Sequence, residues 1–264
     1  MPHLQAHDSQ IYYETTGSGH PLVLIPGFGC DILYFEMIKP ILSPHFQLVL
    51  IDNQCTGRSE CKDKPLTIDA MSKDIASVID HLTLDKPHVL GHSMGGAIAR
   101  TLAYQYPEKV GKVVLYHPLI HLSPIMAAVI RYIITLREDK APTRYEIDAF
   151  MPWLFSNAFM EDPNKRDFLT YQKENEPFPV TLIGLKRQFE AMQKYNGQSE
   201  SQKFGASALV LTGDEDLCCD PNLAKDLAKR LPNAKLYLFE KQGHSTHLEK
   251  PEEFCRVVLD FLKK

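Results

Sequence analysis

Short apolar runs and helical repeats alternate along both ends of the chain. The runs are rich in Val, Leu and Ile, which is typical of strands buried on both faces of a parallel sheet. The predicted strands are 22–25, 46–51, 88–90, 113–116, 208–211 and 235–239, with two more short strands within residues 3–16. Helices are predicted over 67–82, 93–106, 221–231 and 251–263. The alternation predicts an α/β protein whose mostly parallel sheet is flanked by helices on both faces.

The middle of the chain has a different pattern. Residues 118–205 show apolar positions at helical spacing and no clear strand, and they include the only tryptophan, Trp153. Because strand signals resume after this segment, we expect it to be an insertion within one fold. The predicted division is a core formed by 1–117 and 206–264, with a helical segment over 118–205.

Composition and charge narrow the class of protein. The chain has 264 residues, 44% of them hydrophobic, and a formal net charge of −4. That balance excludes a largely disordered chain and argues against a nucleic-acid partner, which would call for a basic surface. The N-terminus lacks the features of a secretory signal, and no run of about 18 apolar residues is present. We therefore expect a cytoplasmic protein without a membrane span.

Six cysteines and eleven histidines raise the question of metal or redox chemistry. The cysteines form no Cys-x-x-Cys pair, and the histidines form no His-Glu-x-x-His motif or clustered ligand set. We therefore expect free thiols, no metal and no cofactor. His92 and His247 are interpreted as packing residues rather than metal ligands.

The strongest chemical signal is a Gly-x-Ser-x-Gly motif. Residues 91–95 read Gly-His-Ser-Met-Gly, directly after a predicted strand and before a predicted helix. A sharp turn in that position presents the Ser93 hydroxyl at the sheet edge, and glycines on both sides avoid collisions with neighbouring elements. The context predicts that Ser93 is a nucleophile at a helix N-terminus, where backbone N–H groups stabilise developing negative charge.

A serine nucleophile needs a base and a group that orients the base. Asp214, Glu215 and Asp216 follow the strand at 208–211, and His244 follows the next one. The carboxyl ends of parallel strands meet at one edge of the sheet, so we expect these groups near Ser93. The order serine, acid, histidine is the order that this type of nucleophile turn predicts.

Taken together, these motifs resemble those of the α/β-hydrolase superfamily over nearly the full chain. The carriers of the resemblance are the turn at 91–95, Gly-Asp-Glu-Asp at 213–216 and Gly-His-Ser-x-His-x-Glu-x-Pro-Glu-Glu-Phe at 243–254. The chain is most similar to small carboxylesterases and to enol-lactonases of the 3-oxoadipate type. The fold implied is the α/β-hydrolase fold with a helical cap, here 118–205.

The resemblance also implies roles for individual residues. Ser93 is the nucleophile, His244 the general base and later the acid, and Asp216, three residues after the glycine, orients His244. Some relatives carry the acid after the preceding strand, but residues 117–120 hold no carboxylate. The backbone N–H groups of Phe28 and Met94 are expected to form the oxyanion hole.

The cap and one loop complete the expectations. Trp153 of the cap is a candidate substrate-binding residue. In the loop at 52–59, Gln54 and Cys55 replace the arginine and first glycine that relatives often carry, which puts the geometry of that loop in doubt. Cys55 itself is expected to be a small buried packing residue.

The predicted function is that of a serine hydrolase, monomeric or homodimeric. Its substrate would be a small carboxylic ester, lactone or thioester. The alternatives are a C–C bond hydrolase or acyltransferase with the same triad, and a non-catalytic ligand receptor on this fold.

Overall fold

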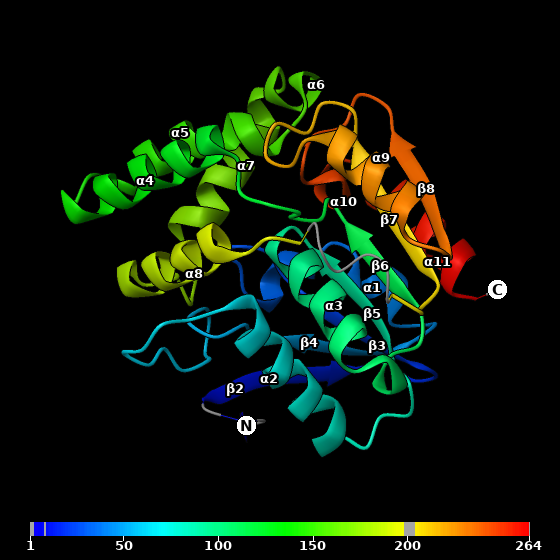
Figure 1. Cartoon of the computed structure of the whole chain (residues 1–264). Helices are drawn as coiled ribbons and strands as arrows, with labels where there is room; N and C mark the ends of the chain where they lie inside the picture. The colour runs from blue at the N-terminus through cyan, green and yellow to red at the C-terminus, as the bar shows by residue number, and fades with distance from the viewer. Residues whose placement is uncertain (1–2, 8, 198–203, 264) are drawn as a thin grey trace.

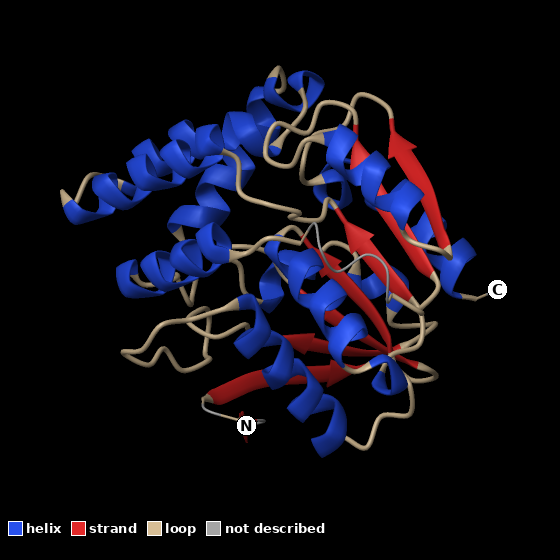
Figure 2. Cartoon of the chain, viewed as in Figure 1, coloured by secondary structure: helices blue, strands red, loops and turns tan. Residues whose placement is uncertain are grey.

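One twisted sheet of eight strands organises the computed structural model, which describes residues 3–7, 9–197 and 204–263 (Figures 1 and 2). The strand order is β1-β2-β4-β3-β5-β6-β7-β8. β1 and β2 pair antiparallel, as do β2 and β4, and all later neighbours pair parallel. The strands are β1 (His3–Gln5), β2 (Gln10–Thr16), β3 (Pro21–Ile25), β4 (Gln47–Ile51), β5 (His88–His92), β6 (Val113–Tyr116), β7 (Ala208–Gly213) and β8 (Ala234–Phe239).

Helices cover both faces of this sheet, because alternate strand residues point to opposite sides. In β4, Val49 and Ile51 belong to the core under α2 (Ile68–His81), α3 (Met94–Gln105) and α9 (Pro221–Arg230). Leu48 and Leu50 belong to the opposite core, with α1 (Lys39–Leu42), the 3₁₀ turn Ile32–Phe35 and α11 (Pro251–Leu262). The predicted α/β architecture, with a mostly parallel sheet and helices on both faces, is confirmed.

The helices between β6 and β7 gather at one end of the sheet (Figure 1). They are α4 (Pro124–Glu138), α5 (Thr143–Leu154), α6 (Asn157–Met160), α7 (Pro163–Glu174) and α8 (Leu182–Lys194). Within the described residues of this segment, strand pairing is limited to a single bridge between His121 and Asn196. The helical character predicted for the middle of the chain is thus observed, although residues 198–203 of the predicted segment lie outside the described residues.

The parallel strands bring six connections to one edge of the sheet. The loops after β3 and β4, the start of α3 after β5, and the segments after β6, β7 and β8 all begin at the carboxyl ends of neighbouring strands. This is the edge at which open α/β sheets bind ligands. Two short elements remain: the helix α10 (Thr246–Glu249) follows β8, and the 3₁₀ turn Pro107–Lys109 follows α3. In the described parts of the chain, no helix is long and apolar enough to cross a bilayer.

Candidate active site

Ser93 lies in a strained turn between β5 and α3. Its backbone has φ 56° and ψ −116°, a conformation that costs a non-glycine residue of the order of 1–3 kcal/mol. A Cβ on Gly91 would lie 2.1 Å from the carbonyl oxygen of Gly95, and a Cβ on Gly95 would lie 2.2 Å from that of Ile25. Only glycine fits at these two positions, so the Gly-x-Ser-x-Gly pattern has the steric cause that the sequence indicated.

Asp216 and His244 form a buried pair on the neighbouring connections. The Nδ1 atom of His244 lies 2.9 and 3.0 Å from the two carboxylate oxygens of Asp216. The backbone N–H groups of Cys218 and Cys219 each donate to Oδ1 of Asp216 at 2.9 Å. With Nδ1 donating to the carboxylate, Nε2 of a neutral His244 carries the lone pair, which is the state that a general base requires.

The two neighbouring histidines keep the Asp216 carboxylate ionised. Burial alone would raise its pKa, but the neighbouring His244 and His117 outweigh burial and hold the pKa of Asp216 well below its usual range. The two nearby acidic residues have other partners. Asp214 is exposed, and Glu215 accepts hydrogen bonds from the N–H and the side-chain amide of Asn157 at 2.9 and 3.1 Å. Of the three carboxylates, Asp216 is the one in contact with His244.

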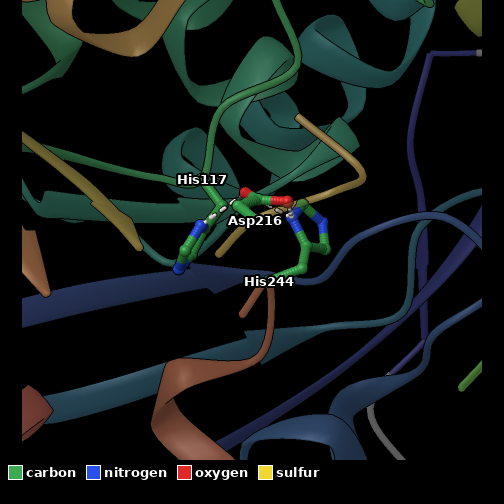
Figure 3. A group of neighbouring side chains, drawn as sticks. All are labelled: His117, Asp216 and His244. Carbon is green, nitrogen blue, oxygen red and sulfur yellow. Dashed lines mark hydrogen bonds and ion pairs between the residues drawn. The ribbon is translucent and has the colours of Figure 1, made fainter. Parts of the chain in front are cut away.

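His117 is a fourth member of this group that the sequence analysis did not identify. Figure 3 shows the Asp216 carboxylate between the imidazoles of His117 and His244. Nδ1 of His117 lies 2.7 Å from Oδ2 of Asp216, and Nε2 lies 3.0 Å from the Thr246 hydroxyl. The signal was its position directly after β6, at the same sheet edge, but only carboxylates were sought there.

These three side chains also have the residue types of a metal site. One donor atom of each of His117, Asp216 and His244 lies within 4.8 Å of the others. Both imidazoles, however, direct Nδ1 at the carboxylate at hydrogen-bond distance. A metal there would have to displace both N–H groups from fully buried partners, so the geometry favours a hydrogen-bonded triad over a ligand set.

Two further buried histidines pack behind the pair. Nε2 of His92 lies 3.0 Å from the backbone oxygen of His244, and His247 contacts the hydroxyl of Tyr116 and the backbone oxygen of Tyr34. Burial lowers the pKa of His247 to about 3, and burial with the neighbouring imidazoles lowers the pKa of His92 well below its usual value. Both are neutral packing residues at pH 7, as the sequence analysis proposed.

These neutral histidines predict a loss of stability in mild acid. Unfolded His92 and His247 would bind protons near pH 6.5, whereas the folded forms do not, so stability falls as pH drops below 6.5. At pH 5.5 we expect a loss of about 3 kcal/mol from the pair. Protonation of folded Asp31, whose pKa burial and Asp52 raise to about 6, would offset roughly 1 kcal/mol of it.

The measurement is the urea midpoint between pH 7.5 and 5.5. His247→Gln is the matched variant, since it removes one of the two groups. It should show a shallower dependence of stability on pH than wild type, whatever its absolute stability. An identical slope in both proteins would contradict the assignment.

A cavity of about 70 Å³ lies between the sheet edge and the cap helices, and Ser93 and His244 both line it. Phe28 lines the same cavity, and Met94 is the first residue of α3, where a backbone N–H has no partner within the helix. The N–H of Gly29, next to Phe28, donates to the side chain of Gln188 on α8 at 2.9 Å. Phe28 therefore borders the cavity and Met94 directly follows Ser93, and the role of their N–H groups as oxyanion donors stays a prediction.

Much of the remaining cavity wall is apolar and comes from the helical segment. These apolar side chains are Leu119, Leu122, Met126, Ile130, Phe150, Leu154 and Met192, while Tyr34, His92 and three cysteines line the cavity as well. Trp153 is not among the described lining residues. It packs against the main core, and its backbone oxygen accepts from the Cys218 thiol at 3.1 Å. The α5 residues that line the cavity are thus Phe150 and Leu154, and a substrate-binding role for Trp153 stays a prediction.

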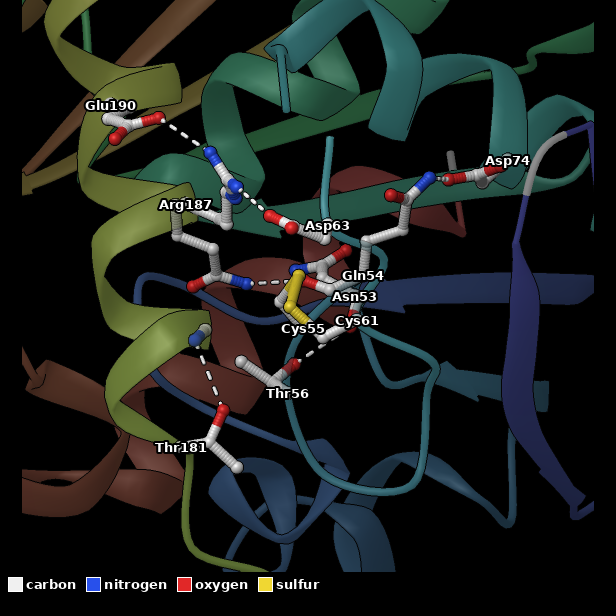
Figure 4. Close-up of a disulfide and its surroundings, with 12 residues drawn as sticks. Asn53, Gln54, Cys55, Thr56, Cys61, Asp63, Asp74, Thr181, Arg187 and Glu190 are labelled. Carbon is white, nitrogen blue, oxygen red and sulfur yellow. Dashed lines mark hydrogen bonds and ion pairs between the residues drawn. A yellow bond between two sulfur atoms is a disulfide. The ribbon is translucent and has the colours of Figure 1, made fainter. Parts of the chain in front are cut away.

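The loop after β4 corrects the expectation that all cysteines are free thiols. Cys55 and Cys61 form a disulfide (Figure 4). Cys55 is buried, as expected, and has φ 70°, a backbone conformation that glycine adopts at low cost. The N–H of Cys55 also donates to the backbone oxygen of Glu60 at 3.2 Å. The loop folds back on itself, and this tertiary turn is what brings the two sulfurs together.

The same loop contacts the cap. Gln188 of α8 donates to the backbone oxygen of Gln54 at 2.8 Å, and Arg187 pairs with Asp63 (Figure 4). In place of the arginine common in relatives, Gln54 donates to the buried carboxylate of Asp74. Although Gln54 and Cys55 depart from the family pattern, the loop is closed by the Cys55–Cys61 disulfide and is hydrogen-bonded to α8 through Gln188.

Comparison with known proteins places this geometry in a family. Over 266 residues the chain is 24% identical to RutD of Azorhizobium caulinodans, named as a candidate carbamate hydrolase, covering 99% of this chain and 98% of the relative. It is 24% identical over 270 residues to 2-hydroxy-6-oxo-6-phenylhexa-2,4-dienoate hydrolase of Comamonas testosteroni, covering 97% and 92%. The enol-lactonase of Burkholderia xenovorans LB400 superposes with a TM-score of 0.87 at 22% identity, over the whole of both chains.

The family match covers most of the fold. Residues 20–200, from just before β3 through the cap helices, match the family described as the alpha/beta hydrolase fold. The relatives named above are hydrolases by name, and they cover the chain nearly end to end. The chain belongs to the alpha/beta hydrolase fold family.

Proposed function

We propose that this protein is a serine hydrolase that cleaves a small carboxylic ester, lactone or thioester through an acyl-enzyme on Ser93. The observation that carries the proposal is the strained serine at a cavity that the imidazole of His244 also lines, with that imidazole held by the buried Asp216. A packing role for Ser93 would not require a left-handed backbone between two glycines that tolerate no side chain.

The proposed reaction uses groups of this chain alone. Nε2 of His244 takes the proton of the Ser93 hydroxyl as the oxygen attacks the substrate carbonyl, and Asp216 stabilises the resulting imidazolium. The N–H groups of Phe28 and Met94 stabilise the oxyanion. His244 then protonates the leaving group, and a water activated by the same imidazole releases the acid. No metal or organic cofactor takes part in this scheme.

The cavity supports a substrate with a small, uncharged acyl group. One water-sized group needs roughly 10–15 Å³ of cavity volume, so a cavity of about 70 Å³ has room for roughly five such groups. The described lining contains no Lys, Arg, Asp or Glu. Its cysteines are neutral at pH 7, because burial raises the pKa of Cys30 to about 12 and that of Cys218 well above its usual value. A carboxylate on the acyl chain would therefore be buried without a cationic partner, at a cost of several kcal/mol.

The same argument ranks the alternative of C–C bond hydrolysis lower. The dienoate hydrolase of Comamonas testosteroni is named for a substrate that carries a carboxylate. The described cavity wall of this chain offers no cation for such a group. The helices α4–α8 are proposed to act as a cap that excludes water from the bound acyl group.

A matched panel of nitrophenyl esters tests this proposal. We expect nitrophenyl butyrate to be hydrolysed with a kcat/KM at least 10-fold above that of nitrophenyl hemisuccinate, which has similar length but a terminal carboxylate. Leu154→Arg, which adds a cation to the wall, should narrow or reverse the preference. A wild-type preference for the hemisuccinate or for a dienoate would overturn the proposed substrate class.

A further inference from the structure

His117 is a completely buried imidazole held from both sides. It follows β6 with φ 45°, and its side chain has no exposed surface. Nδ1 faces Oδ2 of Asp216 at 2.7 Å, and Nε2 faces the Thr246 hydroxyl at 3.0 Å. Both ring nitrogens therefore have partners, and the ring cannot rotate without losing both.

The partners determine where the proton lies on a neutral ring. Asp216 is an acceptor only, so Nδ1 of His117 must carry the proton that lies between them. Nε2 is then an acceptor, and the single proton of the Thr246 hydroxyl lies between this nitrogen at 3.0 Å and the backbone oxygen of Gly243 at 3.3 Å. Burial lowers the pKa of His117, despite the opposing effect of Asp216, which agrees with a neutral ring. Thr246 thus contacts one ring nitrogen of His117, and the other ring nitrogen donates to Asp216, which in turn contacts His244.

The carboxylate of Asp216 has no freedom left in this arrangement. Oδ1 accepts from the N–H groups of Cys218 and Cys219, and Oδ2 accepts from His117. These three donors fix the plane in which the carboxylate meets Nδ1 of His244. His117 supplies the only side-chain donor of the three, from a different strand connection than the other two.

We propose that His117 is a positioning residue, which orients the Asp216 carboxylate toward His244 and shares its negative charge. The inference rests on the proposed serine hydrolase function. Without the His117 N–H, the carboxylate would act more strongly on the imidazolium of His244. Proton uptake by the catalytic pair would then occur at higher pH, and the pair would be less well oriented for the reaction.

Apart from His244, the ionisable side chains that surround His117 do not contact the carboxylate of Asp216. The His244 ring lies 5.2 Å away between centroids, the His92 ring 6.2 Å and the Tyr116 ring 4.6 Å. His92 directs Nε2 to the backbone oxygen of His244, and the Tyr116 hydroxyl contacts His247. Within the described residues, His117 and His244 are the side chains bonded to Asp216.

Two substitutions at position 117 test the proposal. His117→Leu removes the donor at similar volume, whereas the amide of His117→Asn places an N–H near the position of Nδ1. We expect His117→Leu to lower kcat by about 10- to 100-fold and to move the acid limb of the kcat/KM profile upward by roughly half to one pH unit. His117→Asn should keep the wild-type acid limb and a kcat within about threefold of wild type.

A second variant guards against misfolding at position 117. Thr246→Val removes the hydroxyl that contacts Nε2 at nearly the same shape, so the acid limb should move in the same direction by a smaller amount. Proton NMR of histidine-labelled enzyme should show, at pH 7, downfield imidazole N–H signals from the two histidines that donate to Asp216, and one of these is absent in His117→Leu. An unchanged acid limb in both His117→Leu and Thr246→Val would overturn the inference.

Failure of this inference and failure of the proposed function give different results. If a fluorophosphonate labels Ser93 but the acid limb of the kcat/KM profile is the same in wild type and in His117→Leu, only the positioning role is wrong. If Ser93→Ala retains activity, the serine mechanism is wrong, and the NMR signals still report whether His117 donates to Asp216.

Discussion

Ser93→Ala is expected to reduce ester hydrolysis by about 10⁵- to 10⁶-fold, to the level of the activity that the remaining site supports. The hydroxyl oxygen is the atom proposed to form the acyl-enzyme, and no second nucleophile takes its place at the turn. In serine hydrolases, loss of the nucleophile costs about as much as loss of the whole triad, because its members act as one unit. The residual rate comes from binding and oxyanion stabilisation.

The measurement is kcat/KM for the best ester of the panel, with fluorophosphonate labelling followed by mass spectrometry of the adduct. Label should appear on Ser93 in wild type and be absent from Ser93→Ala. The matched control is Ser245→Ala, a buried serine whose hydroxyl contacts Tyr34 at 3.1 Å. It should be labelled at Ser93 as fast as wild type, within about threefold. Equal turnover by wild type and Ser93→Ala would refute the proposed mechanism.

The cysteine thiols near the site make it necessary to identify the labelled residue by mass spectrometry. Cys219 lines the same cavity as Ser93, and a side-chain hydrogen bond with Ser93 partly opposes the burial that raises the pKa of its thiol. The pKa of Cys219 remains well above its usual value, so the thiolate is scarce at neutral pH. If the probe reacted with Cys219 rather than with Ser93, an activity assay alone would not show it. Mass spectrometry of the labelled peptide distinguishes the two residues.

Features with a local cause were predictable from the sequence. Strands β3, β4, β6 and β7 are short apolar runs, and parallel strands buried on both faces need such runs. The turn at Ser93 needs two glycines, because a side chain at either position would collide with atoms of the same motif or of the adjacent strand. Because the connections after parallel strands meet at one edge, an acidic residue after β7 was expected near His244, and the family resemblance selected Asp216 among the three.

Features that depend on a meeting of distant segments were not predictable. His117 and Asp216 are 99 residues apart, and nothing in the residues around His117 shows that its imidazole turns toward a carboxylate. Cys55 and Cys61 are close in sequence, but their disulfide depends on a loop that folds back, which their spacing alone does not require. Trp153 illustrates the remaining limit, because periodicity places a residue on a helix without fixing which neighbours face the cavity.

The second large effect is expected for Asp216→Asn, which should lower kcat by about 10⁴-fold with little change in KM. Asp216 accepts from His117, from His244 and from the N–H groups of Cys218 and Cys219. An asparagine has a single acceptor oxygen, so its NH₂ group would face either an imidazole N–H or a backbone N–H. One histidine would have to change tautomer, and for His244 that change places a proton on the nitrogen that must act as the base.

Asp214→Asn is the matched control, because it makes the same chemical change two residues away. Asp214 is exposed, and within the described residues its carboxylate accepts one long hydrogen bond, of 3.4 Å, from the N–H of Gln242. We expect its kcat to stay within about threefold of wild type. A large loss in Asp214→Asn with a small one in Asp216→Asn would reassign the acid.

The double variant Asp216→Asn with His117→Asn separates the two histidines. If the loss in Asp216→Asn arose from a clash with the His117 N–H, replacing that imidazole by a second amide would restore much of the activity, since two amides can pair donor to acceptor. If the loss arises from the wrong tautomer of His244, the double variant should remain about 10⁴-fold below wild type. We expect the second result, because His244 is the base whichever partner holds Asp216 in place.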